Sequence, residues 1–204
     1  MELRALRNRA LRWVKESVVG IRSNLPFTLI GVDSDNGSEF INHTLIDYCR
    51  AEGIEFTRGR PYRKNDNCFV EQKNDMAVRR TVGYYRFDTE AEFEALQEVY
   101  RNLCPLLNYF YASMKLVEKS RIGAKVIKRY DQPKPPYQRL LESPNVTMEV
   151  KEALRNQAGK LHIMKQKRLV DVAVSKLMRL YDEKKQRGLE LSGSSIAPDG
   201  KIYQ

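Results

Sequence analysis

Hydrophobic positions in the first part of the chain alternate between helical and extended spacing. Residues 3–23 place apolar side chains at helical intervals between arginines, and Pro26 follows as a helix breaker. Residues 27–32 form a short apolar run that is typical of a buried strand. Residues 38–52 return to helical spacing, and residues 54–57 read as a second strand. The order strand, helix, strand predicts a parallel β-α-β unit.

The middle of the chain predicts a loop between this unit and two further helices. Residues 58–67 contain glycine, proline, asparagine and aspartate, which favour a loop. Residues 68–83 have a helical pattern that ends at a glycine. Residues 89–111 form another helical pattern, which begins with Thr89 and Glu92 at the spacing of a capping box.

The rest of the chain divides by composition. Residues 1–118 form the α/β part, and residues 119–146 are basic, contain the run Lys-Pro-Pro-Tyr and predict an extended linker. Residues 147–187 return to helical spacing. Residues 188–204 are rich in glycine and serine, which predicts a disordered tail. In the last helix, apolar side chains recur at helical spacing and predict a core or helix–helix contact at Leu161, Met164, Leu169, Val172, Leu177 and Leu180.

Charge indicates the class of partner. The formal net charge is +10, and residues 120–190 hold 17 Lys and Arg against 8 Asp and Glu, whereas residues 1–119 are close to neutral. Such a distribution favours a polyanion, with DNA the expected partner. The three cysteines form no CxxC pair, and no apolar run approaches the ~18 residues of a membrane span. We therefore expect no membrane partner and a cytoplasmic, nucleoid-associated protein.

Two carboxylates stand in positions that suit metal chemistry. Asp35 follows the first predicted strand within the run Asp-Ser-Asp-Asn-Gly-Ser-Glu-Phe, and Asp33 lies two positions earlier on the same face. Glu71 opens the helical pattern that follows the polar loop. Carboxylates are preferred ligands of Mg²⁺ beside a phosphate. A turn-forming role for Asp35 and a favourable helix-dipole role for Glu71 are the alternatives.

The segments VDSDNGSEFIN and GRPYRKNDNCFVEQKN resemble the integrase catalytic core of bacterial insertion-sequence transposases, which is related to that of retroviral integrases. That family has an RNase H-like fold and a catalytic Asp, Asp, Glu triad. The number of residues between Asp35 and Glu71 is 35, from residue 36 to residue 70. The last two members of the family's triad are separated by the same number of residues. The stretches RRTVGYYRFDT and QRLLES extend the resemblance toward one bacterial transposase group.

The resemblance implies that Asp35 and Glu71 are catalytic and hold Mg²⁺ or Mn²⁺. In that family two metal ions activate water or a DNA 3′-hydroxyl and stabilise the leaving oxygen at phosphorus. The expected function is metal-dependent DNA strand transfer in integration or transposition. The expected fold class is α/β, a partial RNase H-like fold with its last two strands and helices, followed by a mostly helical, basic C-terminal extension.

One member of the triad has no counterpart. The family's first aspartate lies on a strand before the first helix, whereas the earliest aspartate here is Asp33. The resemblance thus describes residues 1–118 as an N-terminally truncated catalytic core. We expect weak metal binding, no catalysis by this chain alone, and a homo-oligomer or a separate N-terminal fragment as a possible partner.

Basic residues in two regions are candidates for DNA contacts, with a solvated surface as the alternative. One set surrounds Glu71: Arg58, Arg60, Arg63, Lys64, Lys73, Arg79 and Arg80. The other lies in the basic segment, where Tyr130 and Tyr137 are interleaved: Arg121, Lys125, Lys128, Arg129, Lys134 and Arg139. Two other functions stay open, a non-catalytic DNA-binding or dimerisation remnant and an RNase H-like nuclease that cuts without joining.

Overall fold

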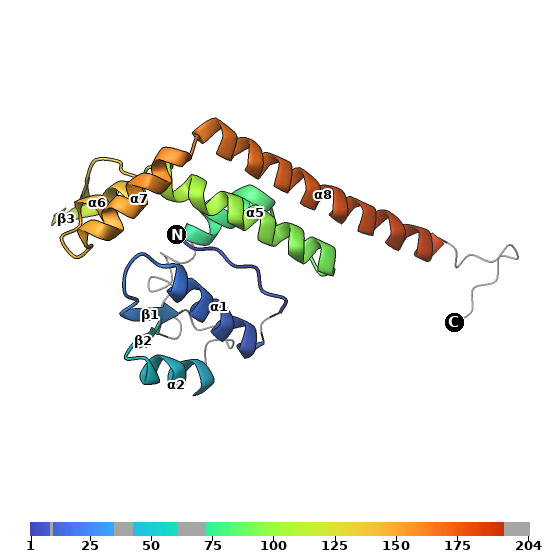
Figure 1. Ribbon diagram of the computed structural model, residues 1–204, viewed down its shortest axis with the longest axis horizontal. Coiled ribbons are helices and arrows are strands. Elements are labelled where there is room, and N and C mark those ends of the chain that lie inside the picture. The colour runs from blue at the N-terminus through green and yellow to red at the C-terminus, as the bar shows by residue number, and fades with distance from the viewer. Residues whose placement is uncertain (9, 35–42, 61–71, 194–204) are drawn as a thin grey trace, which may run out of the picture.

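The computed structural model describes residues 1–8, 10–34, 43–60 and 72–193. The chain is a mixed α/β protein in which a β-α-β unit, a long helical layer and a projecting hairpin are distinguishable (Figure 1). Within these residues, no helix is both long and apolar enough to cross a membrane. The asparagine-glycine turn, the helix start at Ser38 and most of the predicted loop lie outside the described residues.

The first helix begins later than its pattern predicts. Helix α1 spans Leu11–Asn24, whereas residues 1–8 have no helical structure. The prediction of a helix from residue 3 was wrong because Leu3 and Ala5 pack against the long helices elsewhere in the fold. The Asn8 side chain accepts a hydrogen bond from the Ala10 backbone at 2.8 Å, which turns the chain into α1. The helix ends before Pro26, as predicted, with Leu25 in an extended conformation.

The predicted parallel β-α-β unit is confirmed. Strand β1 (Gly31–Ser34) pairs in parallel with β2 (Glu55–Arg58), and α2 (His43–Ala51) lies between them in sequence. Gly53 adopts φ +65°, and its backbone N–H bonds to the Arg50 carbonyl, so the helix stops there. The core of this unit consists of Val14, Leu45, Cys49 and Ile54, and Val32 of β1 and Phe56 of β2 pack against it.

Strand β1 is shifted from the predicted range of residues 27–32. Pairing sets its bounds, because Gly31 is opposite Glu55 at the start of β2. Phe27 and Ile30 precede the strand and are exposed rather than buried. The second strand was predicted within one residue of its observed bounds.

The two central helical predictions are confirmed for the described residues, and residues 68–71 of the first prediction lie outside them. Residues 72–74 are helical and continue into a π-helical turn, η3 (Asp75–Arg79), and α4 (Arg80–Val82), which ends at Gly83. Helix α5 (Glu90–Tyr109) begins with the predicted capping box, in which the Thr89 side chain accepts from the Glu92 backbone and the Glu92 carboxylate accepts from the Thr89 backbone. This cap fixes the start of the helix that forms the centre of the larger core.

Helices α5 and α8 run side by side and form the helical layer (Figure 1). Helix α8 (Ile163–Gly193) follows α7 (Met148–Lys160) and extends past the end of α5. The predicted apolar contact of α8 is confirmed at Leu177, which is fully buried. Met164, Leu169 and Val172 are exposed, so their predicted packing was wrong. The buried face instead includes Val170, Ala173 and Leu177.

The basic segment is not an extended linker. Strands β3 (Leu116–Ile122) and β4 (Lys125–Tyr130) pair antiparallel, and the short helix α6 (Pro136–Glu142) follows them. The extended backbone was predicted, but the pairing of two segments was not. The prediction of a disordered tail was wrong for residues 188–193, which belong to α8, and residues 194–204 lie outside the described part.

Candidate nucleic-acid interface and catalytic segment

The carboxyl ends of β1 and β2 lie at the same edge of the small sheet. Ser34 is opposite Arg58 in the register, and the Gly59 backbone N–H donates to the Ser34 carbonyl at 2.9 Å. Asp35 is the next residue in the sequence after Ser34, but its own placement is outside the described residues, as is that of Glu71. The described strands thus fix the point from which the Asp35 segment departs, beside Arg58.

Asp33 has a structural partner within the sheet. Its side-chain oxygen Oδ1 accepts a hydrogen bond from Oγ1 of Thr57 at 2.7 Å, and the two residues are opposite each other in the register. This cross-strand bond holds the Asp33 carboxylate against β2. One oxygen of the Asp33 carboxylate therefore has a hydrogen-bond partner in the sheet.

The helical segment after Glu71 carries three of the predicted basic residues. Lys73, Arg79 and Arg80 are all exposed. The Arg79 guanidinium lies 4.9 Å from the centre of the Tyr84 ring, and Nε of Arg80 is 3.1 Å from a carboxylate oxygen of Asp75. Among the described residues, neither an ion pair nor a cation–aromatic contact involves the Lys73 ammonium, in contrast to Arg79 and Arg80. Arg79 with exposed Tyr84 is a cation–aromatic pair that the sequence interpretation missed.

The predicted loop residues near Glu71 are only partly placed. Arg58 and Arg60 are exposed at the end of β2, whereas Arg63 and Lys64 lie outside the described residues. The part of the chain that the structure describes contains no group of three His, Cys, Asp or Glu side chains able to hold a metal ion. Asp35 and Glu71 supply the oxygen donors that a hard divalent cation prefers. The donor chemistry fits Mg²⁺ or Mn²⁺, and its geometry stays a prediction.

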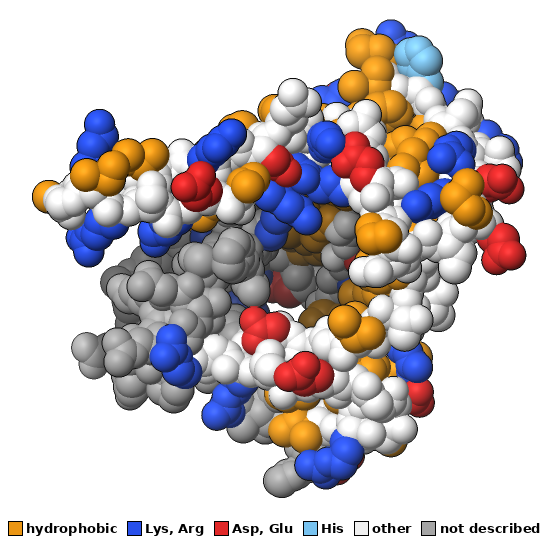
Figure 2. Space-filling model, turned by 90° about the vertical axis from the view of Figure 1, so that its left-hand side faces the viewer, with side chains coloured by type: hydrophobic (Ala, Val, Ile, Leu, Met, Phe, Trp, Pro, Cys, Tyr) orange, Lys and Arg blue, Asp and Glu red, His pale blue; other side chains and the backbone are white. Residues whose placement is uncertain are grey.

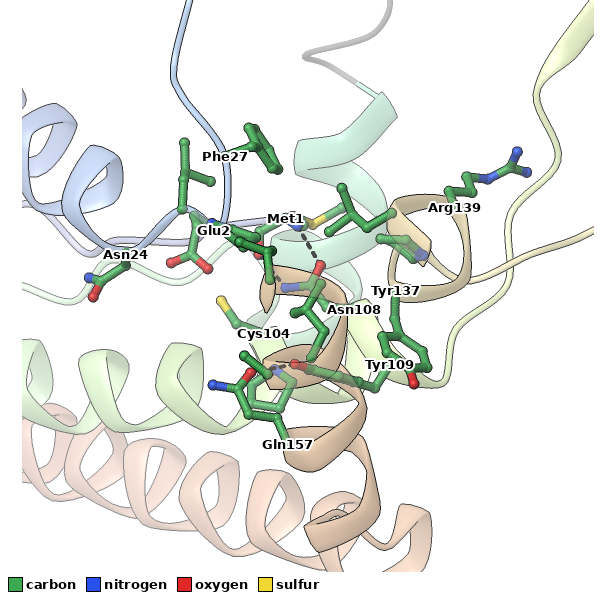
Figure 3. A pocket seen from close by; sticks show the side chains of 18 of the residues that line it. Met1, Glu2, Asn24, Phe27, Cys104, Asn108, Tyr109, Tyr137, Arg139 and Gln157 are labelled. Carbon is green, nitrogen blue, oxygen red and sulfur yellow. Dashed lines mark hydrogen bonds between the residues drawn. The ribbon is translucent and has the colours of Figure 1, made fainter. Parts of the chain in front are cut away.

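A cavity of about 650 Å³ opens beside the segment that carries Lys73. Tyr109 and Tyr137 line one part of it with ring centres 5.1 Å apart, and the Tyr109 hydroxyl donates to Gln157 at 2.6 Å (Figure 3). Asn108 donates to the Met1 carbonyl at 2.8 Å and accepts from the Met1 amine in the same region. The lining that the structure describes is mainly apolar.

The hairpin presents the second predicted set of cations. Arg121, Lys125, Lys128 and Arg129 are exposed on β3 and β4, as is Lys119, which the sequence interpretation did not single out. Figure 2 looks onto the end of the molecule that carries the hairpin and shows Lys and Arg side chains beside hydrophobic ones on its upper part. Gly123 has φ +61° and is flanked by the β-branched residues Ile122, Val126 and Ile127, and this is the signal that could have predicted the hairpin.

Two cations of the basic segment have structural roles instead. Arg139 forms an ion pair with Asp131 at 2.5 Å and donates to the Ser113 carbonyl at 2.6 Å. Lys134 lies 2.7 Å from Glu142. Hydrogen bonding from Arg139 lowers the pKa of Asp131 to about 2. These contacts tie the base of the hairpin to α6, and a DNA contact of Lys134 and Arg139 stays a prediction.

Two known proteins are similar to parts of this chain. No family model matches the chain. An uncharacterized protein of Sinorhizobium fredii, y4rM, is 50% identical over 118 residues, which are 58% of this chain and 34% of that protein. The chain thus spans about a third of the length of this relative. A crystal structure of the catalytic core domain of BIV integrase matches 66% of this chain and 73% of that domain at 21% identity. The TM-score of this match is 0.41.

Proposed function

We propose that this chain is part of a DNA transposase of the Asp, Asp, Glu type, and that Asp35 and Glu71 are two of its metal ligands. The observation that carries the proposal is the pair of motifs separated by 35 residues, with Asp35 directly after a strand of a parallel β-α-β unit. In open α/β sheets, ligands bind beyond the carboxyl ends of the strands. The placement of β1 supports this assignment of Asp35.

A bound divalent metal would supply Lewis-acid stabilisation of the charge that develops at phosphorus and would activate the attacking hydroxyl. The chain's own residues would bind that metal through Asp35 and Glu71 and hold the DNA backbone with nearby cations, among them Arg58 and Lys73. Lysine and arginine contacts to phosphates position a duplex without reading its sequence. The proposed substrate is therefore DNA, positioned by charge at the edge of the small sheet.

We also propose that this chain alone does not join DNA. A metal site with only two carboxylates binds Mg²⁺ weakly, because the ion keeps near-ideal octahedral geometry and loses its waters reluctantly. The sequence contains no aspartate before Asp33, and Asp33 is bonded to Thr57. We propose that another polypeptide segment supplies the third carboxylate.

Metal binding tests the ligand assignment. Titration of the protein with Mn²⁺, followed by electron paramagnetic resonance, should give weak binding that is lost in Asp35→Asn and in Glu71→Gln. Asp47→Asn is the matched control, because Asp47 is an exposed aspartate on α2 whose partner is Arg50 rather than a metal. Equal binding by all four proteins would refute the assignment.

A strand-transfer assay with duplex oligonucleotides tests the second statement. We expect no joined product from the purified chain with Mg²⁺ or Mn²⁺. Robust joining that Asp35→Ala abolishes would overturn the statement that the chain is inactive alone, while supporting the role of Asp35. Cleavage without joining would favour the nuclease alternative.

The non-catalytic alternative has an observation in its favour. Five exposed cations lie on the hairpin, an element that contains neither Asp35 nor Glu71, so DNA binding by this surface would not require the metal ligands. Two results together would favour a DNA-binding remnant. The Asp35→Asn and Glu71→Gln variants would bind DNA with the affinity of the unmodified chain, and none of the proteins would bind metal.

A further inference from the structure

The antiparallel register sorts the hairpin cations between two faces. Lys119 is directly opposite Lys128, and Arg121 lies two residues along β3 from Lys119. Side chains two residues apart on a strand share a face, as do directly opposed side chains. Lys119, Arg121 and Lys128 therefore lie together on one face, here called the three-cation face. Lys125 and Arg129 lie on the opposite face.

The opposite face has part of its charge balanced. Arg129 is opposite Glu118, and its guanidinium is 3.8 Å from that carboxylate. In the part of the chain that the structure describes, no ion pair involves a side chain of the three-cation face. The two faces of one hairpin thus differ in net charge, although both are exposed to solvent.

The Lys119–Lys128 pair is unfavourable for the hairpin by itself. Directly opposed side chains have Cβ atoms about 4.5–5.5 Å apart, and like charges at that distance destabilise a strand pair. An isolated two-stranded hairpin is also only marginally stable in water. Repulsion at this position is relieved when an anion neutralises both ammonium groups. The arrangement therefore favours a partner with closely spaced negative charges.

The base of the hairpin holds this face in a fixed position. Asp131, the residue after β4, accepts from the Lys115 backbone at 2.7 Å and from Arg139 on α6. The Ser113 and Lys134 backbones also bond to each other across the base. The strands of six and seven residues project about 20 Å from this anchor, at about 3.3 Å a residue. A two-stranded ribbon of this kind is narrow enough for the major groove of B-DNA.

We propose that the three-cation face binds the phosphate backbone of duplex DNA and that the opposite face does not. This inference rests on the proposed function, because it takes DNA as the substrate. It adds to the proposed function a DNA-binding surface that is separate from the metal ligands. Tyr130 is exposed on the same strand as Lys128 and two residues from it, so it lies on the binding face. Lys119 becomes a DNA contact that the basic pattern alone did not single out.

Two double variants test the proposal, because each removes two positive charges from the same hairpin. Lys119→Gln with Lys128→Gln alters the three-cation face, and Lys125→Gln with Arg129→Gln is the matched control. Binding of a 30-base-pair duplex is measured by fluorescence anisotropy in EDTA between about 50 and 200 mM salt. We expect the first variant to reduce the magnitude of the slope of log K against log salt concentration by about 2, because each of two lost phosphate contacts contributes about 0.9. We expect the control variant to leave this slope nearly unchanged.

Equal losses in the two variants, or no loss in the first, would overturn the proposal. The melting temperature of both variants should stay within the range of the unmodified protein, which separates lost contacts from lost folding. Because EDTA removes divalent ions, the result is independent of the metal site, and a failure here is distinguishable from a failure of Mn²⁺ binding. Vesicles of phosphatidylglycerol form the comparison arm, and a stronger dependence of vesicle binding than of DNA binding on the three-cation face would assign the surface to lipid instead.

Discussion

At the residue scale, the best-defined polar cluster joins the two long helices. Glu92 is fully buried near the start of α5, where its carboxylate accepts from the Thr89 and Asp88 backbones. The Lys184 ammonium on α8 lies 2.8 Å from Glu92 and 2.8 Å from Asp88. Burial by itself raises the pKa of Glu92, but bonding to Lys184 and Thr89 outweighs it and lowers that pKa to about 2. A buried carboxylate with this many donors is a structural link.

Replacing Glu92 tests that link. We expect Glu92→Gln to lower the free energy of unfolding by about 1–3 kcal/mol at pH 7, because Lys184 then loses a charged partner. The folded pKa of about 2 lies below the ordinary value of 4.5, so the stabilisation is present above pH 4.5 and disappears as the pH falls toward 2. Urea unfolding between pH 7 and pH 3 should therefore show a smaller pH dependence for the variant. Glu94→Gln, on the exposed side of α5, should behave like the unmodified protein.

Gly83 gives a second residue-scale prediction. Its φ of +72° lies in the left-handed region, and an added Cβ would be 2.9 Å from the Tyr85 ring. We expect Gly83→Ala to destabilise the protein by about 1–2 kcal/mol from the backbone conformation alone. Thermal unfolding measures the effect. Gly20→Ala is the control, because a Cβ at Gly20 meets no atom within 4 Å and alanine favours a helix interior. A stability loss as large in the control would contradict the explanation.

At the element scale, the β3–β4 hairpin depends on contacts at its base. Every residue of β4 is exposed, so neither strand gains much from packing against the body of the protein. The pair of Arg139 and Asp131, with the bond from Asp131 to the Lys115 backbone, fixes where the hairpin starts. The element thus owes its position to a few polar contacts more than to apolar burial.

Removing the anchor should loosen the hairpin without unfolding the protein. In Asp131→Asn, the carboxylate that holds Arg139 is lost, so amide hydrogen exchange in β3 and β4 should become several times faster. Exchange in α5 should not change, because α5 packs mainly against α8. Glu149→Gln, an exposed acid in the first turn of α7, is a charge-matched control. Unchanged exchange in the hairpin would show that the anchor has no such role.

At the scale of the whole molecule, different core residues stabilise the β-α-β unit and the helical layer. Leu45 and Cys49 belong to the core of the β-α-β unit, whereas Val99, Ala173 and Leu177 belong to that of the helical layer. Leu3 and Ala5 join the helical layer although they precede α1 in the sequence. The first residues of the chain therefore connect the two parts.

The two cores should respond separately to cavity-forming substitutions. Leu45→Ala and Leu177→Ala each remove a fully buried side chain and should cost about 2–5 kcal/mol. In a Cys68→Ser background, thiol labelling of Cys49 should accelerate in Leu45→Ala, and labelling of Cys104 in Leu177→Ala. Both thiols are buried, so each reports local opening of its own part. Equal acceleration of both thiols in each variant would show one cooperative unit instead.

Local sequence determined the elements whose signals are complete within a few residues. The capping box at Thr89 and Glu92 fixed the start of α5, Gly53 fixed the end of α2, and the order of apolar runs predicted the parallel pairing of β1 with β2. The spacing of Asp35 and Glu71 was also readable directly. Capping, left-handed glycine and hydrophobic periodicity act over one or two turns, so a single sequence contains them.

Only the tertiary structure decided the remaining features, because they depend on distant partners. Leu3 and Ala5 have helical spacing, yet packing against the long helices keeps them out of α1. Lys134 and Arg139 read as free cations, yet Glu142 and Asp131 hold them. The cations of residues 119–129 read as one basic run, yet strand pairing divides them between two faces. The sequence alone showed that this segment is positively charged. The pairing register, which forms between separate segments, decided which cations share a face.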